Sequence, residues 1–324
     1  TETTPLSVKA GRDALLARGC QVNTAPRRAE RDATREDHAP LFAPPEHPVA
    51  LKATDLCFAW PGERENVIEY LNFALHRGEI CGLVGGNGSG KSTFMKLLNG
   101  VLKPARGKIE IADQEHGDKL KPISRPFGLG KSKSVVPPLT ELVRLPQDIT
   151  LMFREMTLTE EFEKSGYPEA VQQRWIDYFE LNDLLDRHPF DLSGGEQQRA
   201  ALAIVMLSDP DILLLDEPTK SIDAETKLRL GACLRDLARQ GKAILLTSHD
   251  LDFTATYADT CCMMFDRHIL GYAPIGEFFR ENLFYTTVAD LMSRGLSCHR
   301  IAANDLIDTV RARLAAGCQG GHGA

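Results

Sequence analysis

A glycine-rich stretch carries the residue types that hold phosphate groups. Residues 85–92 read Gly-Gly-Asn-Gly-Ser-Gly-Lys-Ser, which fits the pattern G-x-x-x-x-G-K-[ST] of loops that wrap nucleotide phosphates. Glycines let the backbone approach phosphate oxygens, and successive N–H groups at a helix start attract anions. Lys91 is spaced to reach the β- and γ-phosphates, and the Ser92 hydroxyl to bind Mg²⁺. The stretch predicts a nucleoside triphosphate site.

Two acidic residues follow a strongly apolar run. Residues 212–215 are Ile-Leu-Leu-Leu, and Asp216 and Glu217 come next. Ligands of open α/β sheets sit at the carboxyl ends of strands. There Asp216 can hold Mg²⁺ through a water, and Glu217 can accept a proton from an attacking water. The alternative, a strand that ends in a solvated turn, is disfavoured beside a phosphate loop.

A second glycine pair stands at a predicted helix start, in residues 192–199, Leu-Ser-Gly-Gly-Glu-Gln-Gln-Arg. The Ser193 hydroxyl and the N–H groups of Gly194 and Gly195 suit a phosphate oxygen. One nucleotide needs one phosphate loop, so this anion site is expected to serve a nucleotide held by another subunit. Taken alone, the stretch favours an ordinary helix capped by Ser193, with Glu196 at capping-box spacing.

Two aromatic side chains carry a functional and a structural interpretation. His249 follows the apolar residues 243–247 at the predicted sheet edge of Asp216 and Glu217, where a neutral imidazole can donate to a γ-phosphate. A lone histidine is more often structural, but this placement favours the phosphate contact. Trp60, just before Pro61 and Gly62, suits stacking on adenine and capping of an apolar edge equally well.

Composition limits the class of protein. The chain has 324 residues, of which 43% are hydrophobic and 26% charged, and its net charge is −7, which does not favour nucleic-acid binding. The longest apolar run, residues 200–207, is too short to span a membrane, so any membrane role requires a partner. The eight cysteines form no C-x-x-C pair and are expected to be buried, reduced thiols of a cytoplasmic protein.

The remaining chain predicts the organisation around these residues. Apolar strands at 80–84, 142–145, 212–215, 243–247 and 261–265 alternate with helices at 93–98, 193–207 and 224–240. This alternation predicts an α/β fold of the P-loop NTPase type with a mainly parallel sheet. Strands at 51–60, 71–75 and 108–112 indicate a small antiparallel sheet, and residues 150–208 an inserted helical subdomain. A basic stretch, 116–135, is interpreted as a solvated loop in preference to a docking surface.

The ends of the chain lie outside this pattern. Residues 1–48 combine a short amphipathic helix around 6–16 with a segment rich in charge and proline, which is typical of a linker. We expect them to be the tail of a preceding module and a linker, because the chain also begins at Thr1. The ATPase domain is expected at 49–275, and a helical tail with a disordered end at 276–324.

Together the motifs resemble the nucleotide-binding domain of ATP-binding cassette (ABC) ATPases over residues 49–275. The matching stretches, in chain order, are 85–92, Pro146-Gln147, 192–196, Leu-Leu-Asp-Glu-Pro at 214–218, Ser221-Ile222-Asp223 and Ser248-His249-Asp250. The chain departs from the family pattern in about a dozen extra residues between Gly107 and Gln147, which we place in the basic loop. It also has Ser-Ile before Asp223, where Gly-Leu or Ala-Leu is common.

The resemblance implies a role for each matching residue. Catalytic roles fall to Glu217 as base, His249 as switch histidine and Gln147 as sensor of Mg²⁺ and γ-phosphate. The cofactors are ATP and Mg²⁺, with Ser92, Gln147 and Asp216 around the metal. The residues implied to contact nucleotide are Trp60, which now favours adenine stacking, with Gly85, Gly86, Asn87, Gly88, Ser89, Gly90, Lys91, Ser92, Thr93, Ser193, Gly194, Gly195 and Asp223. Three of these, Ser193, Gly194 and Gly195, serve the opposite subunit, and Asp223 lies at the dimer interface.

Within the superfamily the chain is most similar to the second cassette of energy-coupling factor (ECF) importers with two fused cassettes. This resemblance rests on residues 278–290 and 5–12. It implies a peripheral subunit on the cytoplasmic face of the membrane that energises import of a vitamin, its precursor or a transition-metal ion. Its partners would be a second cassette, fused or identical, and integral membrane subunits, with no nucleic acid. The alternatives are a cassette of an exporter or of a binding-protein-dependent importer, and a soluble ABC ATPase outside transport.

Overall fold

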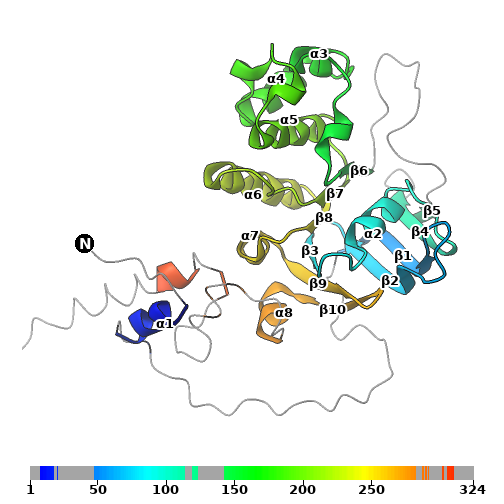
Figure 1. Ribbon diagram of the computed structural model, residues 1–324, viewed down its shortest axis with the longest axis vertical. Coiled ribbons are helices and arrows are strands. Elements are labelled where there is room, and N and C mark those ends of the chain that lie inside the picture. The colour runs from blue at the N-terminus through cyan, green and yellow to red at the C-terminus, as the bar shows by residue number, and fades with distance from the viewer. Residues whose placement is uncertain are drawn as a thin grey trace, which may run out of the picture. The chain divides into compact units, whose positions relative to one another are not determined.

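The computed structural model describes residues 8–17, 20, 47–113, 119–122, 142–281, 287, 289, 291, 301–302 and 305–309. The chain divides into two compact units. Residues 43–249 and 257–272 form the larger unit, which contains both sheets (Figure 1). Residues 1–42, 250–256 and 273–324 form the smaller one.

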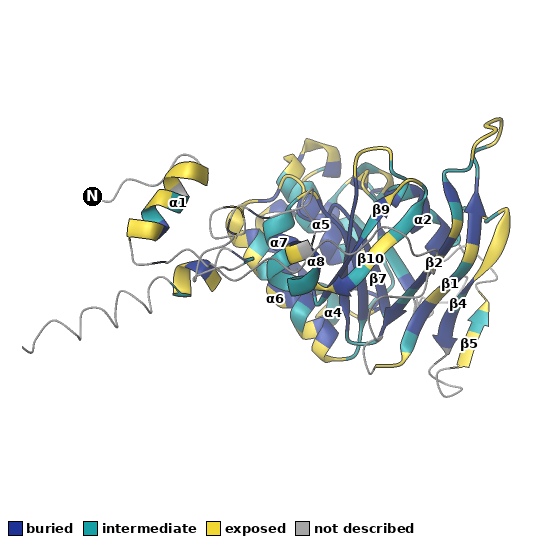
Figure 2. Cartoon of the chain, turned by 90° about the horizontal axis from the view of Figure 1, so that it is seen from below, coloured by how far each residue is buried: buried dark blue, intermediate teal, exposed yellow. Residues whose placement is uncertain are grey.

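A mainly parallel sheet forms the centre of the larger unit. Its strand order is β10-β9-β3-β8-β7-β6. The bounds are β3 Ile80–Val84, β6 Leu142–Leu145, β7 Ile212–Asp216, β8 Ala243–Thr247, β9 Thr260–Phe265 and β10 His268–Pro274. From β9 to β6 neighbouring strands pair in parallel. Every residue of β3, β7 and β8 is buried, as expected of parallel strands covered on both faces. Figure 2 draws β7 in the dark blue of buried residues.

A second, antiparallel sheet of four strands packs against the helix that follows the phosphate loop. Its order is β2-β1-β4-β5, with bounds β1 Val49–Phe58, β2 Ile68–His76, β4 Arg106–Asp113 and β5 Lys119–Pro122. Helix α2, Lys91–Leu98, shares one buried cluster with this sheet and with β7 and β8. The rings of Phe73 in β2 and Phe94 in α2 pack edge to face at 5.5 Å. The predicted combination of a parallel and an antiparallel sheet is confirmed.

The inserted helical part is also present. It contains η2 Ile149–Met152, α3 Leu158–Glu163, α4 Glu169–Tyr178, η3 Asn182–Leu184, η4 Pro189–Asp191 and α5 Gly194–Met206. Figure 1 shows α3, α4 and α5 grouped beside α6, Ala224–Arg239. The helical pattern over 157–187 is broken because Gly166 adopts φ 77° and Pro168 occupies the N-cap of α4. The capping box expected of Ser193 and Glu196 is confirmed.

The smaller unit contains helix α1, Val8–Ala17, close to the predicted bounds of 6–16. Leu15, Cys20, Ala289 and Leu306 form a small buried cluster there. Cys20 is disulfide-bonded, so the expectation of reduced thiols is wrong for this cysteine. It is confirmed for the buried, free cysteines Cys57, Cys81, Cys233, Cys261 and Cys262.

The short elements that were not predicted include β5 and α7, Leu251–Tyr257, whereas α8, Ile275–Glu281, lies at the start of the expected helical tail. Most of the expected linker, most of the basic stretch and most of the C-terminal tail lie outside the described residues. Within the described part of the chain, no helix is both long and apolar enough to cross a membrane.

Gly107 provides a test of how closely β4 approaches β1. Its φ is +90°, and a Cβ built there would lie 2.4 Å from the carbonyl oxygen of Thr54 and 2.5 Å from that of Asp55. Gly62 has the same φ of +90° with nothing within 4 Å of a built Cβ. Replacing Gly107 by alanine therefore adds a backbone collision to the penalty for positive φ, whereas replacing Gly62 adds the penalty alone.

We expect Gly62→Ala to lower the free energy of unfolding by about 1 kcal/mol. Gly107→Ala should lower it by about 3 kcal/mol or more, because overpacking adds to the penalty. Chemical denaturation of both variants measures the difference. Equal losses would contradict the close approach of the two strands.

Candidate nucleotide site

The 85–92 loop lies between β3 and α2, as predicted. Gly90 is the N-cap of α2 and adopts φ 104°, a conformation that glycine accepts easily. The ammonium Nζ of Lys91 donates to the carbonyl oxygens of Gly85 at 2.7 Å and Gly86 at 3.1 Å. The lysine side chain therefore folds back over the loop. The backbone N–H groups of such a loop, at the start of a helix, can bind an anion.

Lys91 shares its surroundings with the two acids that follow β7. Its side chain is buried, and burial lowers the pKa of the Lys91 ammonium, while the carboxylates of Glu217 and Asp216 oppose this shift. The opposing effect requires that both carboxylates lie within electrostatic reach of the ammonium. The structure thus brings the phosphate loop and the predicted acid pair into one site.

Thr247 holds the two acids in place. β7 and β8 pair in parallel, and Asp216 lies opposite Thr247 in the register. The Thr247 hydroxyl donates to Asp216 Oδ1 at 2.7 Å, and it accepts from the Glu217 N–H at 3.1 Å. Thr247 has no exposed surface. The sequence analysis missed this role, although Thr247 was identified as the last residue of its strand.

Glu217 combines a strained backbone with a fixed carboxylate. Its φ of 57° is left-handed and unfavourable for a residue with a Cβ. The N–H of His249 donates to Glu217 Oε2 at 3.1 Å, and the His249 Nε2 atom lies 3.5 Å from Oε1. The imidazole is 60% exposed and the glutamate side chain 11%. His249 therefore covers the acid from the solvent side, as its position in the sequence indicated.

Each of the two acids keeps one buried oxygen that no hydrogen bond satisfies. Within the described residues, Asp216 Oδ2, Glu217 Oε1 and the Ser89 hydroxyl have no partner. Buried polar atoms normally have one, so these atoms point to a polar ligand. The described residues contain no cluster of three side chains that could hold a metal alone. The unsatisfied Oδ2 of Asp216 suits Mg²⁺, which binds through one or two carboxylates together with phosphates and waters.

Gln147 and Trp60 lie next to elements that form this site. Gln147 follows β6, which pairs in parallel with β7, so it lies at the same edge of the sheet as Asp216. Trp60 follows β1 and lies beside α2, where Lys96 Nζ is 5.9 Å from the centroid of the indole ring. Phe58 packs edge to face against the same ring at 5.2 Å.

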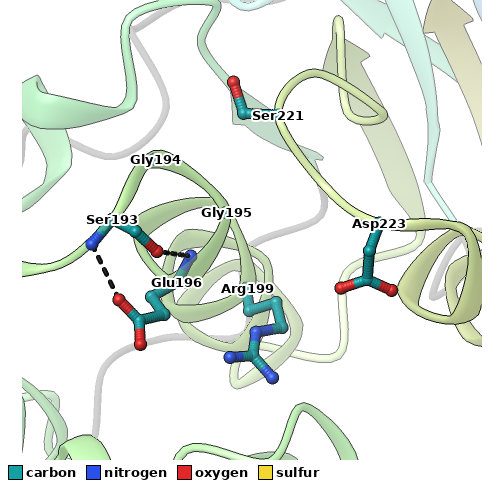
Figure 3. Close-up of a pocket in the computed structure, with 7 residues that line it drawn as sticks. All are labelled: Ser193, Gly194, Gly195, Glu196, Arg199, Ser221 and Asp223. Carbon is teal, nitrogen blue, oxygen red and sulfur yellow. Dashed lines mark hydrogen bonds between the residues drawn. The ribbon is translucent and has the colours of Figure 1, made fainter.

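A separate hollow surrounds the second glycine pair. Figure 3 shows its lining residues, which are Ser193, Gly194, Gly195, Glu196, Arg199, Ser221 and Asp223. No residue of the 85–92 loop is among them. The Ser193 hydroxyl accepts from the Glu196 N–H at 3.4 Å, and the Ser193 N–H donates to Glu196 Oε2 at 2.7 Å. Hydrogen bonding of the Glu196 carboxylate to the side chain and the backbone N–H of Ser193 lowers the pKa of Glu196.

Two chain segments meet at this hollow. A Cβ on Gly195 would lie 2.8 Å from the carbonyl oxygen of Ser221, so only glycine fits there. Asp223 caps α6 by accepting from the Thr226 N–H at 2.8 Å, and this bond lowers the pKa of Asp223. The hollow therefore joins the starts of α5 and α6. Arg199 and Ser221 belong to it, and the sequence analysis did not assign them to a site.

Fold and site together define a nucleotide-binding protein with a phosphate loop. Residues 68–220 match the model of the ABC transporter family. The energy-coupling factor transporter ATP-binding protein EcfA2 of Lactobacillus delbrueckii subsp. bulgaricus is 33% identical over 72% of this chain and 82% of its own. The chain belongs to the ATP-binding cassette family of ATPases.

Two further comparisons define how far this similarity extends. A protein of Bacillus cereus described as an ABC transporter ATP-binding protein is 34% identical over 76% of this chain, and the chain spans 43% of its length, less than half. The solved structure of cbiO1 from Clostridium perfringens, part of the ABC transporter complex cbiONQ, is 23% identical with a TM-score of 0.56. The match covers 72% of this chain and 92% of the cbiO1 chain, and it supports the assignment of the fold.

The Thr247 hydroxyl can be tested without touching either acid. Thr247→Val removes the donor to Asp216 Oδ1 and leaves this buried oxygen unpaired, while the Glu217 N–H keeps its bond to the Thr247 carbonyl, so the substitution should lower the free energy of unfolding by about 1–3 kcal/mol. Thr247→Ser keeps the hydroxyl and is the matched control. Thermal or chemical denaturation compares them. A valine variant as stable as the serine variant would contradict the bridging role of the hydroxyl.

Proposed function

We propose that this chain is the ATP-binding and ATP-hydrolysing subunit of a membrane transporter. The observation that carries the proposal is the meeting of Lys91, Asp216, Glu217 and His249 at one buried sheet edge. Positive and negative groups of this kind, next to a phosphate loop, suit the transfer of a γ-phosphoryl group to water.

The phosphate end of ATP is assigned to the 85–92 loop and Thr93. Backbone N–H groups of residues 86–93 and the Lys91 ammonium neutralise the β- and γ-phosphates. Ser92, Gln147 and Asp216 would hold Mg²⁺, which supplies further neutralisation of phosphate charge when bound. The unpaired Asp216 Oδ2 supports this assignment. Trp60, beside α2, is assigned to the adenine ring.

Glu217 is assigned as the general base. Its Oε1 atom is buried and has no hydrogen bond within the described chain, while Oε2 is held by the His249 N–H. One oxygen is thus fixed and the other remains able to accept a proton from the attacking water. The His249 ring, exposed and 3.5 Å from Oε1, is positioned to contact the γ-phosphate.

The hollow at Ser193, Gly194 and Gly195 is assigned to the nucleotide of a second cassette. It contains no residue of this chain's phosphate loop, yet it offers a serine, a helix start and the cation of Arg199. We infer that two cassettes, fused or identical, close head to tail around two ATP molecules. ATP then acts as a ligand with higher affinity for the closed state.

The membrane partner is assigned to the helical part. Leu151 after β6 and Met156 before α3 are 73% and 66% exposed, the two highest exposures among the large apolar side chains of the described residues, which makes them available to a protein contact. The similarity to EcfA2 favours an ECF importer for a vitamin, its precursor or a transition-metal ion. The chain would act at the cytoplasmic face of the membrane, with 49–275 as ATPase domain, 1–48 as linker and 276–324 as tail.

Glu217→Gln tests the base. The amide cannot accept the proton, so we expect ATP hydrolysis to fall by about 10²–10⁴-fold with ATP binding retained. Glu169→Gln, on the exposed start of α4, is the control and should keep wild-type turnover. Phosphate release and nucleotide binding are measured on both. Turnover of Glu217→Gln near the wild-type rate would remove Glu217 from this role.

The transport assignment is tested by the native gene product purified from detergent-solubilised membranes. We expect a small integral membrane protein and a coupling transmembrane subunit to copurify, identified by mass spectrometry. Recovery of ribosomes or DNA, or of no membrane protein, would overturn the transport assignment and leave the ATPase chemistry intact.

A further inference from the structure

Glu180 occupies a backbone position that normally belongs to glycine. It follows the C-cap Phe179 of α4 and adopts φ 53°. The Leu181 N–H donates to the Ile176 carbonyl at 3.0 Å, and the Glu180 N–H to the Asp177 carbonyl at 3.1 Å. These are the two bonds of a Schellman motif, in which glycine is favoured at the left-handed residue. A glutamate there is strained, and an observed strain of this kind invites a functional explanation.

The Glu180 carboxylate bridges two other helices. Its Oε1 lies 2.5 Å from Nη1 of Arg229 in α6, and its Oε2 lies 3.6 Å from Nη1 of Arg199 in α5. The Tyr178 hydroxyl, on the last turn of α4, donates to the Arg229 carbonyl at 2.9 Å. The end of α4 is therefore attached to α6 by a side chain and by the backbone, and to α5 by a side chain. We call these three contacts the Glu180 clamp.

Stability alone does not account for this glutamate. Its side chain is 56% exposed, and those of Arg229 and Arg199 are 33% and 20% exposed. Exposed ion pairs add little to folding stability, whereas a glycine would remove the backbone strain. What the carboxylate supplies, and glycine would not, is a charge that connects three helices.

The helices joined by the clamp are those that begin at the hollow. α5 starts at Gly194, and α6 starts after Asp223. The two starts are already in close contact, because Gly195 leaves no room for a Cβ against Ser221. A rotation of α5 against α6 would thus change the shape of the hollow. The Glu180 clamp contacts both helices a turn or two after their first residues, where it opposes such a rotation.

We propose that Glu180 is a positioning residue that fixes the angle between α5 and α6, and so presents Ser193 and Gly194 to the nucleotide of the second cassette. This proposal rests on the proposed function, since it assumes that the hollow serves a nucleotide. It concerns a residue that contacts no nucleotide itself. Its loss should therefore change turnover more than nucleotide affinity.

The test compares three variants of the full chain. Glu180→Gly removes the charge and relieves the backbone, Glu180→Gln removes the charge and keeps the strained backbone, and Glu225→Gln is the matched control. Glu225 pairs with the same arginine, Arg229, at 2.7 Å, but both residues lie on α6. The control thus loses an ion pair to Arg229 without loss of a contact between helices.

Amide hydrogen exchange is measured over residues 176–181 and 194–198, together with melting temperature and steady-state hydrolysis of MgATP. Both Glu180 variants should exchange about two- to fivefold faster there, the range expected for an ordinary surface ion pair. Glu180→Gly should melt no lower than wild type. In both variants kcat should fall about two- to fivefold with KM unchanged, and Glu225→Gln should match wild type throughout.

Unchanged exchange in both Glu180 variants, or an equal rise in Glu225→Gln, would overturn the positioning role. Unchanged kcat in the Glu180 variants of an active protein would overturn it as well. A wild-type chain that neither binds nor hydrolyses MgATP would instead refute the proposed function. Exchange requires no nucleotide, so it would still decide whether the clamp exists.

Discussion

The parallel pairing of β3, β8 and β7 is the constraint on which the site depends. All fifteen residues of these strands are buried, and buried backbone groups must find hydrogen-bond partners. The register is therefore fixed, and with it the point at which each strand ends. The phosphate loop follows β3. Asp216 is the last residue of β7 and Glu217 comes directly after it, and Thr247 is the last residue of β8. Residues far apart in sequence meet because their strands end at one edge.

Charge balance is the second constraint on this edge. Lys91, Asp216 and Glu217 are all buried, and isolated buried charges are strongly unfavourable. The Thr247 hydroxyl, the His249 N–H and the carbonyls of Gly85 and Gly86 each satisfy one of the three side chains. They leave one oxygen of each acid unsatisfied. The protein thus keeps these charges near neutrality and leaves two carboxylate oxygens able to contact a polar ligand.

Much of this arrangement could be predicted from the sequence, because the decisive signals are local. Strands β3, β6 and β8 have the predicted bounds, since each is a short apolar run next to glycine, proline or charge. β5 and α7 were missed, because four and seven residues carry too little periodicity. The bridging role of Thr247 depends on the register between strands. The disulfide of Cys20 depends on a pairing that the spacing of cysteines in the sequence does not determine. These features arise from contacts that are distant in sequence.

Residues other than glycine that have a positive φ occur in two settings, one required by the fold and one that calls for a functional explanation. Asp266 and Arg267, with φ 43° and 72°, form the two-residue turn between β9 and β10, where hairpin geometry requires positive φ at both positions. Glu217 and Glu180 also have positive φ, at the ends of β7 and α4, where a glycine would carry no such conformational penalty. In both the strained backbone orients a carboxylate toward partners on other elements, His249 in one and Arg199 and Arg229 in the other. Strain at a position where glycine would relieve it invites a functional explanation of the side chain. For Glu217 and Glu180 the contacts of the carboxylate with other elements supply the second observation that such an explanation needs.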